Sequence, residues 1–447
     1  MKGRTFRKAY WTAYTLWHVR DEAKLPFRPL DEITALQNRR VRAVVAHAYD
    51  SVPYYREVMD AARLQPRDFR TADDFARLPV LTGRELARDP QRCLSSRYAN
   101  GRALEVRSSG TSGYSKAIFY DAAALFLALA HGHRQRHALA RFVGKTYGYR
   151  EMHLVREKGV AHQLREFYES HSWVPRKVDL DRDSASPGES FEGTIARLNM
   201  FKPDVVRGYG THVGALFRFA STHQLPLHRP KCVAYGADRM ADADRVLIES
   251  EFGAPVISTY QAAEALRIGF QCEERKAFHV SIDHTAVRVV DAEGNPVAPG
   301  GKGEIVISNL VNRASVLLNY KLGDVVTLSA EPCACGRTLP TIEAIDGRAD
   351  DFLTLEGGRR MHALVALAPL LRVAGVVQVQ LIQEETQRFV LKVVCAPQSV
   401  WASVCRDLNA ALRSTLGDSL GLDIERTETM APEASGKVKS VISRCRD

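Results

Sequence analysis

The sequence predicts a mixed α/β protein in two domains. From about residue 104, short apolar runs alternate with amphipathic segments, a pattern typical of strands and helices in a mainly parallel sheet. In the stretch from Ala286 to Ser308, Val287, Val289, Ile305 and Ile307 lie at alternate positions on either side of a polar turn, which indicates a small antiparallel β region. A further change of pattern lies near residue 346. We therefore expect a large N-terminal domain over residues 1–346 and a small α+β domain over residues 347–447.

The length and composition are those of an ordinary globular protein. The 447 residues suffice for two or three domains of roughly 100–200 residues each. Hydrophobic residues make up 45% and charged residues 26%, which excludes a disordered, fibrous or disulfide-stapled chain. Eight cysteines are few, and no apolar run reaches the roughly 18 residues of a membrane span. We therefore expect a cytoplasmic protein without a membrane span.

The first hundred residues carry helical patterns. Apolar residues recur at helical spacing between residues 36 and 48, and Thr82 with Glu85 forms a capping-box pattern. Residues 1–24 are basic and aromatic but lack the apolar core of a secretory signal. We expect an N-terminal helix that packs its aromatic side chains on the domain, and the alternative is a helix that lies on a membrane surface.

The middle and the end of the chain divide into short elements. The strand patterns lie at Ala117–Tyr120, Val205–Tyr209, Cys232–Tyr235 and Val256–Tyr260, and the helical ones at Val213–Ser221 and Asp242–Phe252. Beyond residue 346, strand patterns at Val376–Ile382 and Phe389–Val394 flank a polar turn, and Val400–Leu416 has the pattern of an amphipathic helix. These elements define the small α+β domain.

The net charge of +10 permits binding to polyanions but says nothing about the fold. The chain contains no block of five or six like charges and no nucleic-acid recognition motif. We therefore expect small anionic substrates rather than a nucleic acid, and a nucleic-acid-binding protein stays as the alternative from another class.

The segment Ser108–Lys116 carries a Gly/Ser/Thr loop before a strand pattern. Backbone N–H groups and hydroxyls of such a loop can converge on phosphate oxygens, and Lys116 would add a point charge. It is not a Walker loop, because Ser115 stands where the second glycine is required. A flexible surface turn is the alternative.

Cysteine and histidine form a second candidate site. Cys272, His279, Cys333 and Cys335 offer three thiolates and one imidazole, which suit a closed tetrahedral zinc site of structural type. Ordinary buried thiols are the alternative, because the spacing is irregular.

Four further segments are individually weak signals. They are Thr259–Glu264, with an aromatic residue and a carboxylate after a strand; Tyr320–Asp324, with an Asp after a glycine; Gly347–Phe352; and Ala434–Lys439, with Lys437 on a small-residue turn. Their order and spacing along one chain carry the information.

With these segments in this order, the chain resembles the adenylate-forming ligases, which activate carboxylates as acyl-adenylates. The resemblance covers nearly the whole chain and is strongest to the phenylacetate–coenzyme A ligase branch, including members associated with capsule biosynthesis. The segments Ser51–Tyr55 and Leu78–Thr82 look like that branch in particular. Relatives in this branch have a similar Cys/His cluster, which strengthens the zinc hypothesis.

The resemblance implies a nucleotide site. Tyr260 would stack on adenine, Asp324 would take the ribose hydroxyls with Arg348 beside it, and Glu264 would help to hold Mg²⁺. The implied nucleotide-binding residues are Ser108, Ser109, Gly110, Thr111, Ser112, Gly113, Lys116, Gly236, Ala237, Asp238, Tyr260, Asp324 and Arg348.

The resemblance also implies the catalytic machinery. Lys437 would serve adenylation together with Thr111 and Glu264, and Asp350 would be the hinge of a mobile C-terminal domain. We expect the acyl pocket between two strand ends, at Tyr209, Gly210, His212, Gln261, Ala262 and Ala263. Gln261 departs from the family, in which a glycine usually follows the tyrosine.

The implied activity is an ATP-dependent ligation. The enzyme would adenylate a carboxylic acid, expected to be aromatic, and transfer the acyl group to coenzyme A. One alternative keeps the acyl-adenylate but transfers the acyl group to an amine or a carrier-protein thiol. Another alternative is a degenerate protein that binds the nucleotide without catalysis. The sequence leaves the oligomeric state open, a dimer included.

Overall fold

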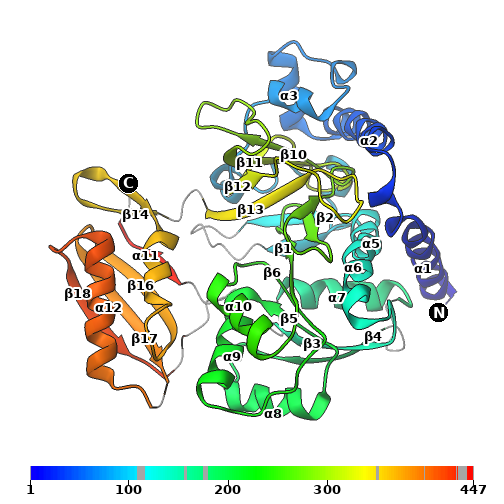
Figure 1. Ribbon diagram of the computed structural model, residues 1–447. Helices are drawn as coiled ribbons and strands as arrows, with labels where there is room; N and C mark the ends of the chain where they lie inside the picture. The colour runs from blue at the N-terminus through cyan, green and yellow to red at the C-terminus, as the bar shows by residue number, and fades with distance from the viewer. Residues whose placement is uncertain are drawn as a thin grey trace. The chain divides into compact units, whose positions relative to one another are not determined.

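The computed structural model describes residues 2–107, 116–155, 159–174, 180–348, 352–396, 398–428, 430 and 440–445. The chain divides into two compact units, whose helices and strands are labelled in Figure 1. Unit 1 comprises Met1–Tyr149, Glu157–Asp181 and Ile257–Asp346, and unit 2 comprises Arg150–Arg156, Arg182–Val256 and Gly347–Asp447. The division into domains 1–346 and 347–447 stays a prediction.

The N-terminal part of unit 1 is helical, as predicted. Its helices are α1 (Lys2–Glu22), α2 (Leu30–Ser51), α3 (Pro53–Ala61), α4 (Gly83–Arg88), α5 (Ala122–His131), α6 (His133–Val143) and α7 (Val160–His171), with 3-10 turns at Leu25–Phe27, Pro66–Asp68, Ala72–Arg77 and Ser96–Tyr98. The capping box is confirmed, because the Thr82 side chain accepts a hydrogen bond from the Glu85 N–H and returns one to the Glu85 carboxylate. On α2, Val41, Val44 and Val45 are fully buried, which confirms the helical period.

The strands of unit 1 are largely antiparallel. β1 (Leu104–Arg107) pairs with β2 (Ala117–Tyr120). Seven further strands are hydrogen-bonded in the order β10-β11-β12-β13-β9-β8-β7. Their bounds are β7 Val256–Tyr260, β8 Gly269–Gln271, β9 Phe278–Val280, β10 Thr285–Val290, β11 Lys302–Asn309, β12 Tyr320–Leu328 and β13 Thr341–Arg348. β10 and β11 form the antiparallel region that the alternation over residues 286–308 predicts. The core of this unit gathers α2 and the inward side chains of β11 and β12, such as Ile305 and Tyr320.

Unit 2 contains the parallel strands. They run in the order β6-β5-β3-β4, with β3 Tyr149–Leu154, β4 Leu180–Ala185, β5 Val205–Tyr209 and β6 Cys232–Gly236. β5 pairs in parallel with both β3 and β6, as the alternation of strand and helix patterns predicts. The helices between them are α8 (Phe191–Phe201), α9 (Gly210–Thr222) and α10 (Asp242–Glu251). Val206, Val213 and Val233 lie in their shared core.

The C-terminal residues of unit 2 form the expected α+β arrangement. Their sheet has the order β18-β17-β16-β19, with β16 Val376–Glu385, β17 Arg388–Cys395, β18 Gly421–Arg426 and β19 Val441–Ser443. The hairpin β14 (Phe352–Thr354) and β15 (Arg360–His362), the turn Glu356–Gly358 and the helices α11 (Ala363–Leu370) and α12 (Trp401–Leu416) complete it. α12 buries Val404, Leu408 and Leu412 at helical spacing against the core that the sheet also lines. The predicted mixed α/β class is confirmed.

Candidate active site

A buried ion pair joins two of the predicted site residues. The Lys116 Nζ lies 2.6 Å from Glu264 Oε1, and both side chains are almost fully buried. The Tyr320 hydroxyl completes the group, since it lies 3.0 Å from Lys116 Nζ and donates to Glu264 Oε1 at 2.9 Å. We call Lys116, Glu264 and Tyr320 the Lys116 cluster. The cluster joins the residue before β2, the segment after β7 and the first residue of β12.

The Lys116 cluster keeps its carboxylate ionised. Burial by itself raises the pKa of Glu264, but the Lys116 charge and the hydrogen bonds from Lys116 and Tyr320 outweigh it, so the pKa lies below the usual value. The backbone around Glu264 is also held, because Asn309 Nδ2 donates to the Glu264 carbonyl at 3.1 Å and the Tyr120 hydroxyl donates to the Ala263 carbonyl at 2.6 Å. The site thus presents a fixed anionic oxygen beside a cation.

A second contact joins the predicted adenine and ribose residues. The Tyr260 hydroxyl donates to Asp324 Oδ2 at 2.6 Å. Asp324 reaches this position through a bulge, since β11 and β12 shift register between Glu304 and Val306, and Gly323 in β12 has φ +86°. Only glycine adopts this backbone angle readily, and a bulge of this kind re-aims the next side chain. The bulge therefore explains why a glycine precedes Asp324 in this segment.

In unit 2, Asp238 holds the start of α9. One carboxylate oxygen of Asp238 accepts from the Gly210 N–H, and the other accepts from the Thr211 hydroxyl at 2.5 Å. Gly210 has no room for a side chain, because a Cβ there would lie 2.6 Å from the Met240 nitrogen. Of the predicted adenine-strip residues, Gly236 ends β6 and Ala237 has φ +69°. These contacts fix the β5–α9 turn that carries the predicted acyl residues.

The remaining predicted acyl residues lie at strand ends. Tyr209 ends β5, and Gln261, Ala262 and Ala263 directly follow β7, all partly buried. His212 is 6% exposed, its Nε2 has no hydrogen-bond partner among the described residues, and burial lowers its pKa to about 4. A neutral imidazole at this position suits the wall of a pocket for an uncharged ring.

The Cys/His cluster is gathered in space. The Sγ atoms of Cys272 and Cys333 lie 3.6 Å apart, and Cys335 Sγ lies 3.3 Å from His279 Nε2. All four candidate ligand atoms lie within 4.8 Å of one another, although the residues come from two separate segments. The thiols are free, and burial lowers the pKa of His279 to about 4, which leaves the neutral imidazole that a metal requires.

Several predicted residues lie outside the described residues. They are Ser108, Ser109, Gly110, Thr111, Ser112 and Gly113 of the phosphate loop, the hinge residue Asp350 and Lys437. Arg348 is described and ends β13, where it is partly buried.

Tyr320 is a site residue that the sequence analysis missed. It opens the Tyr320–Asp324 segment, but its character as an aromatic residue at the start of a strand indicates only core packing. Its full burial agrees with that interpretation, while its hydroxyl contacts both charges of the Lys116 cluster. A buried tyrosine needs a partner for its hydroxyl, and this requirement is the one signal that points to a polar role.

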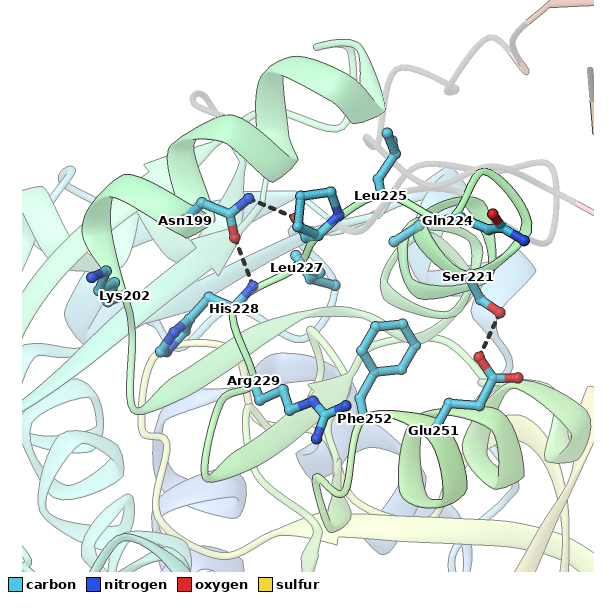
Figure 2. A pocket seen from close by; sticks show the side chains of 12 residues that line it. Asn199, Lys202, Ser221, Gln224, Leu225, Leu227, His228, Arg229, Glu251 and Phe252 are labelled. Carbon is cyan, nitrogen blue, oxygen red and sulfur yellow. Dashed lines mark hydrogen bonds between the residues drawn. The ribbon is translucent and has the colours of Figure 1, made fainter.

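A cavity of about 580 Å³ opens in unit 2, at the ends of α8, α9 and α10 (Figure 2). Asn199 bridges the Pro226 carbonyl and the His228 N–H on one side, and Ser221 bonds Glu251 on the other. Its lining contains none of the predicted acyl-pocket residues. The cavity is therefore not the predicted acyl site.

Comparison with known proteins shows what the chain is similar to. No protein-family model matches the chain. In fold, the chain is similar to a crystal structure of 2-hydroxyisobutyryl-CoA ligase in the postadenylation state, with a TM-score of 0.73 and 18% identity over 93% of this chain and 90% of the other. The chain thus shares the fold of this adenylate-forming ligase.

The relatives in sequence support the adenylate-forming ligase superfamily and its phenylacetate–coenzyme A ligase branch. It is 29% identical to the phenylacetate-coenzyme A ligase of Thermus thermophilus over 355 residues, which is 75% of each chain. It is also 20% identical to the protein CapK of Staphylococcus aureus over 449 residues, covering 99% of this chain and 95% of CapK. Both resemblances drawn from the sequence motifs are confirmed.

Proposed function

We propose that this protein is an ATP-dependent, AMP-forming acid–thiol ligase that converts a carboxylic acid into its acyl-adenylate and then into a coenzyme A thioester. The observation that carries the proposal is the meeting of two motif segments: Tyr260 bonds Asp324 at 2.6 Å, and Tyr320 bonds Glu264 at 2.9 Å. The segment 259–264 thus contacts the segment 320–324 at both of its ends.

The chemistry requires cations beside a bound polyphosphate. The substrate carboxylate attacks the α-phosphorus of ATP, the bond to the bridging oxygen breaks, and pyrophosphate leaves. Because two anions meet, positive charge must face the phosphates. Lys116 can turn from Glu264 to a phosphate oxygen, and Lys437 would neutralise the reacting carboxylate and α-phosphate. In the second step the thiolate of coenzyme A attacks the acyl carbon, and AMP leaves.

The nucleotide would be oriented by the β7 and β12 residues. Asp324 would accept from the ribose hydroxyls, the Tyr260 hydroxyl holds that carboxylate in place, and the Tyr260 ring would stack on the base. Glu264 fits Mg²⁺, since it offers an ionised oxygen, and Mg²⁺ is usually held by one or two carboxylates together with substrate phosphates. When bound, the metal would neutralise charge on the departing pyrophosphate.

We propose an aromatic acid as the substrate. The small side chains of Ala262 and Ala263 in unit 1 would admit a flat ring, and in unit 2 Tyr209 and the neutral, buried His212 are residue types that suit one. Gln261 adds an amide that could bond a polar substituent on the ring. We propose coenzyme A as the acceptor of the acyl group. An amine or a carrier-protein thiol is the alternative acceptor.

The activity is tested with a panel of carboxylates in a pyrophosphate-release assay, followed by product analysis with coenzyme A, amines and a carrier protein. We expect release with aromatic acids and a thioester as the product. Lys437→Ala should abolish carboxylate-dependent pyrophosphate exchange without unfolding the protein, whereas Lys439→Ala, two residues along, should retain it. ATP binding without exchange for any acid would indicate a degenerate nucleotide binder.

We also propose a structural zinc ion at Cys272, His279, Cys333 and Cys335. The four ligand types and their convergence fit a closed tetrahedral site, which would tie the Cys333 loop to the strands β8 and β9. Metal analysis of protein purified without chelator should find about one zinc per chain, and Cys335→Ser should lose it. Cys405→Ser, which changes a cysteine remote from this site in the sequence, is the matched control. Absence of zinc from the wild-type protein would contradict the site.

A further inference from the structure

Helix α1 has two apolar faces, and the domain covers only one of them. The inner face carries Trp11, which stacks on Phe126 of α5 with ring centroids 4.8 Å apart and planes 13° apart. The outer face carries Phe6, Tyr10 and Trp17, which are 75%, 53% and 69% exposed. Leu16 beside them is 53% exposed.

The outer residues form a continuous stripe. Phe6, Tyr10, exposed Ala13 and Trp17 follow one another at intervals of four, three and four residues, which places them on one side of a helix. We call Phe6, Tyr10, Leu16 and Trp17 the outer stripe. In Figure 1, α1 lies at the edge of unit 1 beside α5 and α6. The structure thus leaves the outer stripe open along the helix.

The helix cannot bury the outer stripe by turning about its axis. At its C-terminal end Glu22 is buried and accepts from Arg134 Nε at 2.6 Å, and at its middle Trp11 is held against Phe126. Near its start Lys8 Nζ donates to the Glu169 carbonyl at 2.7 Å. Since these anchors lie on the inner side along the helix, the exposure of the outer stripe is a fixed property of the fold.

The charges around the outer stripe are mainly positive. Arg7, Arg20 and Lys24 are exposed, and the Arg20 guanidinium lies 5.9 Å from the centre of the Trp17 ring. The acidic residues of α1 are only Asp21 and Glu22, of which Asp21 pairs with Arg28 and Glu22 is buried. A surface with aromatic side chains between arginines matches the boundary of an anionic bilayer, where aromatic rings lie at the headgroup level and cations contact lipid phosphates.

We propose that the outer stripe, with Arg7 and Arg20, docks this protein on an anionic lipid surface, with α1 lying in the plane of the membrane. Among the described residues no helix combines the length and apolar character needed to cross a bilayer, so the contact is peripheral. A second copy of the chain suits the surface less well. A whole aromatic side chain has a surface of roughly 150–250 Å², so the four partly exposed residues of the outer stripe offer an exposed area on the order of 500 Å². A stable protein interface buries about 800 Å² per partner, and arginines would face arginines across a two-fold contact.

The proposal is tested by flotation of the full-length protein with vesicles. One set contains phosphatidylcholine alone, and the other contains phosphatidylcholine with about one third phosphatidylglycerol. We expect binding to the anionic vesicles, weakened by salt, and little binding to the neutral ones. Arg7→Glu with Arg20→Glu should weaken binding by at least about 25-fold, at roughly fivefold for each basic charge removed.

The apolar part is tested by Phe6→Ser, Tyr10→Ser and Trp17→Ser combined, which should lower binding at least tenfold. The matched control is Met200→Ser with Val246→Ser, which removes exposed apolar side chains of unit 2 and should bind like the wild type. Thermal unfolding checks that all variants fold. Emission of the wild type should shift to the blue on anionic vesicles, and Trp17→Phe should remove most of that shift.

Equal binding to both vesicle types, or wild-type binding by the three-serine variant, would overturn the proposal. So would a concentration-dependent dimer in sedimentation that the three-serine variant loses, because the outer stripe would then bind a second copy. Each result is independent of the ligase activity, which is measured without lipid.

Discussion

Unit 1 buries two charged clusters that differ in how firmly each charge is held. In the first, Arg134 is 1% exposed and bonds Glu22 at 2.6 Å and both carboxylate oxygens of Asp283 at 2.8 and 2.9 Å. We call Arg134, Glu22 and Asp283 the Arg134 cluster. In the Lys116 cluster, one ammonium meets one carboxylate, with a tyrosine hydroxyl between them.

The difference suggests that the Arg134 cluster is structural, whereas the charges of the Lys116 cluster can change partners. The planar guanidinium fork of Arg134 is matched on two sides, and moving it would leave the buried Glu22 without its arginine and Asp283 with Arg40, whose Nη1 lies 3.2 Å away. An ammonium is a point charge on a flexible stem, so in the proposed function Lys116 would leave Glu264 for a phosphate while Glu264 would take a metal ion. The first arrangement holds the end of α1 to the core, and the second suits a nucleotide site.

The largest expected effect is on stability. Arg134→Met should lower the free energy of unfolding by about 3–5 kcal/mol, because it leaves the buried Glu22 without its arginine and Asp283 with Arg40 in place of two arginines. Denaturant unfolding measures the loss. Arg141→Met on the same helix, where the side chain is 69% exposed, should stay within about 0.5 kcal/mol of the wild type. A small loss for Arg134→Met would remove the distinction between the clusters.

The next effect is on catalysis. Glu264→Gln keeps the shape and a hydrogen-bonding oxygen but removes the charge, and we expect pyrophosphate exchange to fall about 10²–10³-fold. Its loss of stability should be smaller than that of Arg134→Met, because the amide oxygen can still accept from Lys116 and Tyr320. Glu343→Gln at an exposed position of β13 is the control. Full exchange in Glu264→Gln would assign the Lys116 cluster to structure instead.

Acid should weaken the Arg134 cluster before the Lys116 cluster, because His284 lies 3.6 Å from Glu22 and 3.5 Å from Asp283 of the first. His131 and His284 stack at 4.1 Å, and burial lowers the pKa of both, for His131 well below its usual value. The unfolded chain binds these protons near pH 6.5, so stability is lost as the pH falls below about 6.5. Between pH 7.5 and 5.5 each histidine that stays neutral costs about 1.4 kcal/mol.

The measurement compares denaturant unfolding at these two pH values for the wild type and His131→Gln. We expect the variant to lose about 1.4 kcal/mol less than the wild type on acidification. The carboxylates do not interfere, since the pKa values of Glu22 and Asp283 are lowered by Arg134 against the effect of burial and their stabilisation is lost only at lower pH. An equal loss in both proteins would show that His131 takes up a proton in the folded state.

The smallest effect concerns nucleotide binding. Tyr260→Phe removes the hydroxyl that holds Asp324, and we expect the KM for ATP to rise about tenfold while kcat changes little. Tyr168→Phe removes a buried hydroxyl that bonds the Leu125 carbonyl and is the matched control. A fall in kcat with unchanged KM would mean that Tyr260 acts in the transition state rather than in binding.

Much of the fold followed from periodicity. The strands β5 and β7, the helix α12 and the capping box at Thr82 were predicted to within a residue or so, because each has a local pattern of burial or hydrogen bonding. The short strands β8 and β9 were not predicted. Three residues are too few to show a period, and their pairing partners determine them.

The candidate site divides in the same way. Glu264, Tyr260 and Asp324 were recognisable because each belongs to a motif of fixed order, whereas Tyr320 resembled a core residue. The Arg134 cluster escaped the sequence analysis altogether, since Arg134 lies 112 residues from Glu22 and 149 from Asp283. No local pattern relates residues so far apart.

By itself, the sequence determined the class of fold, the order of the site segments and the amphipathic character of the elements, because these depend on neighbours within a few residues. Only the tertiary structure decided which charges are paired and which apolar face is left open. Lys116 meets Glu264, the four zinc-ligand candidates converge, and the anchors at Trp11 and Glu22 turn the outer stripe of α1 to solvent. Long-range packing sets these contacts, since it balances burial over the whole unit.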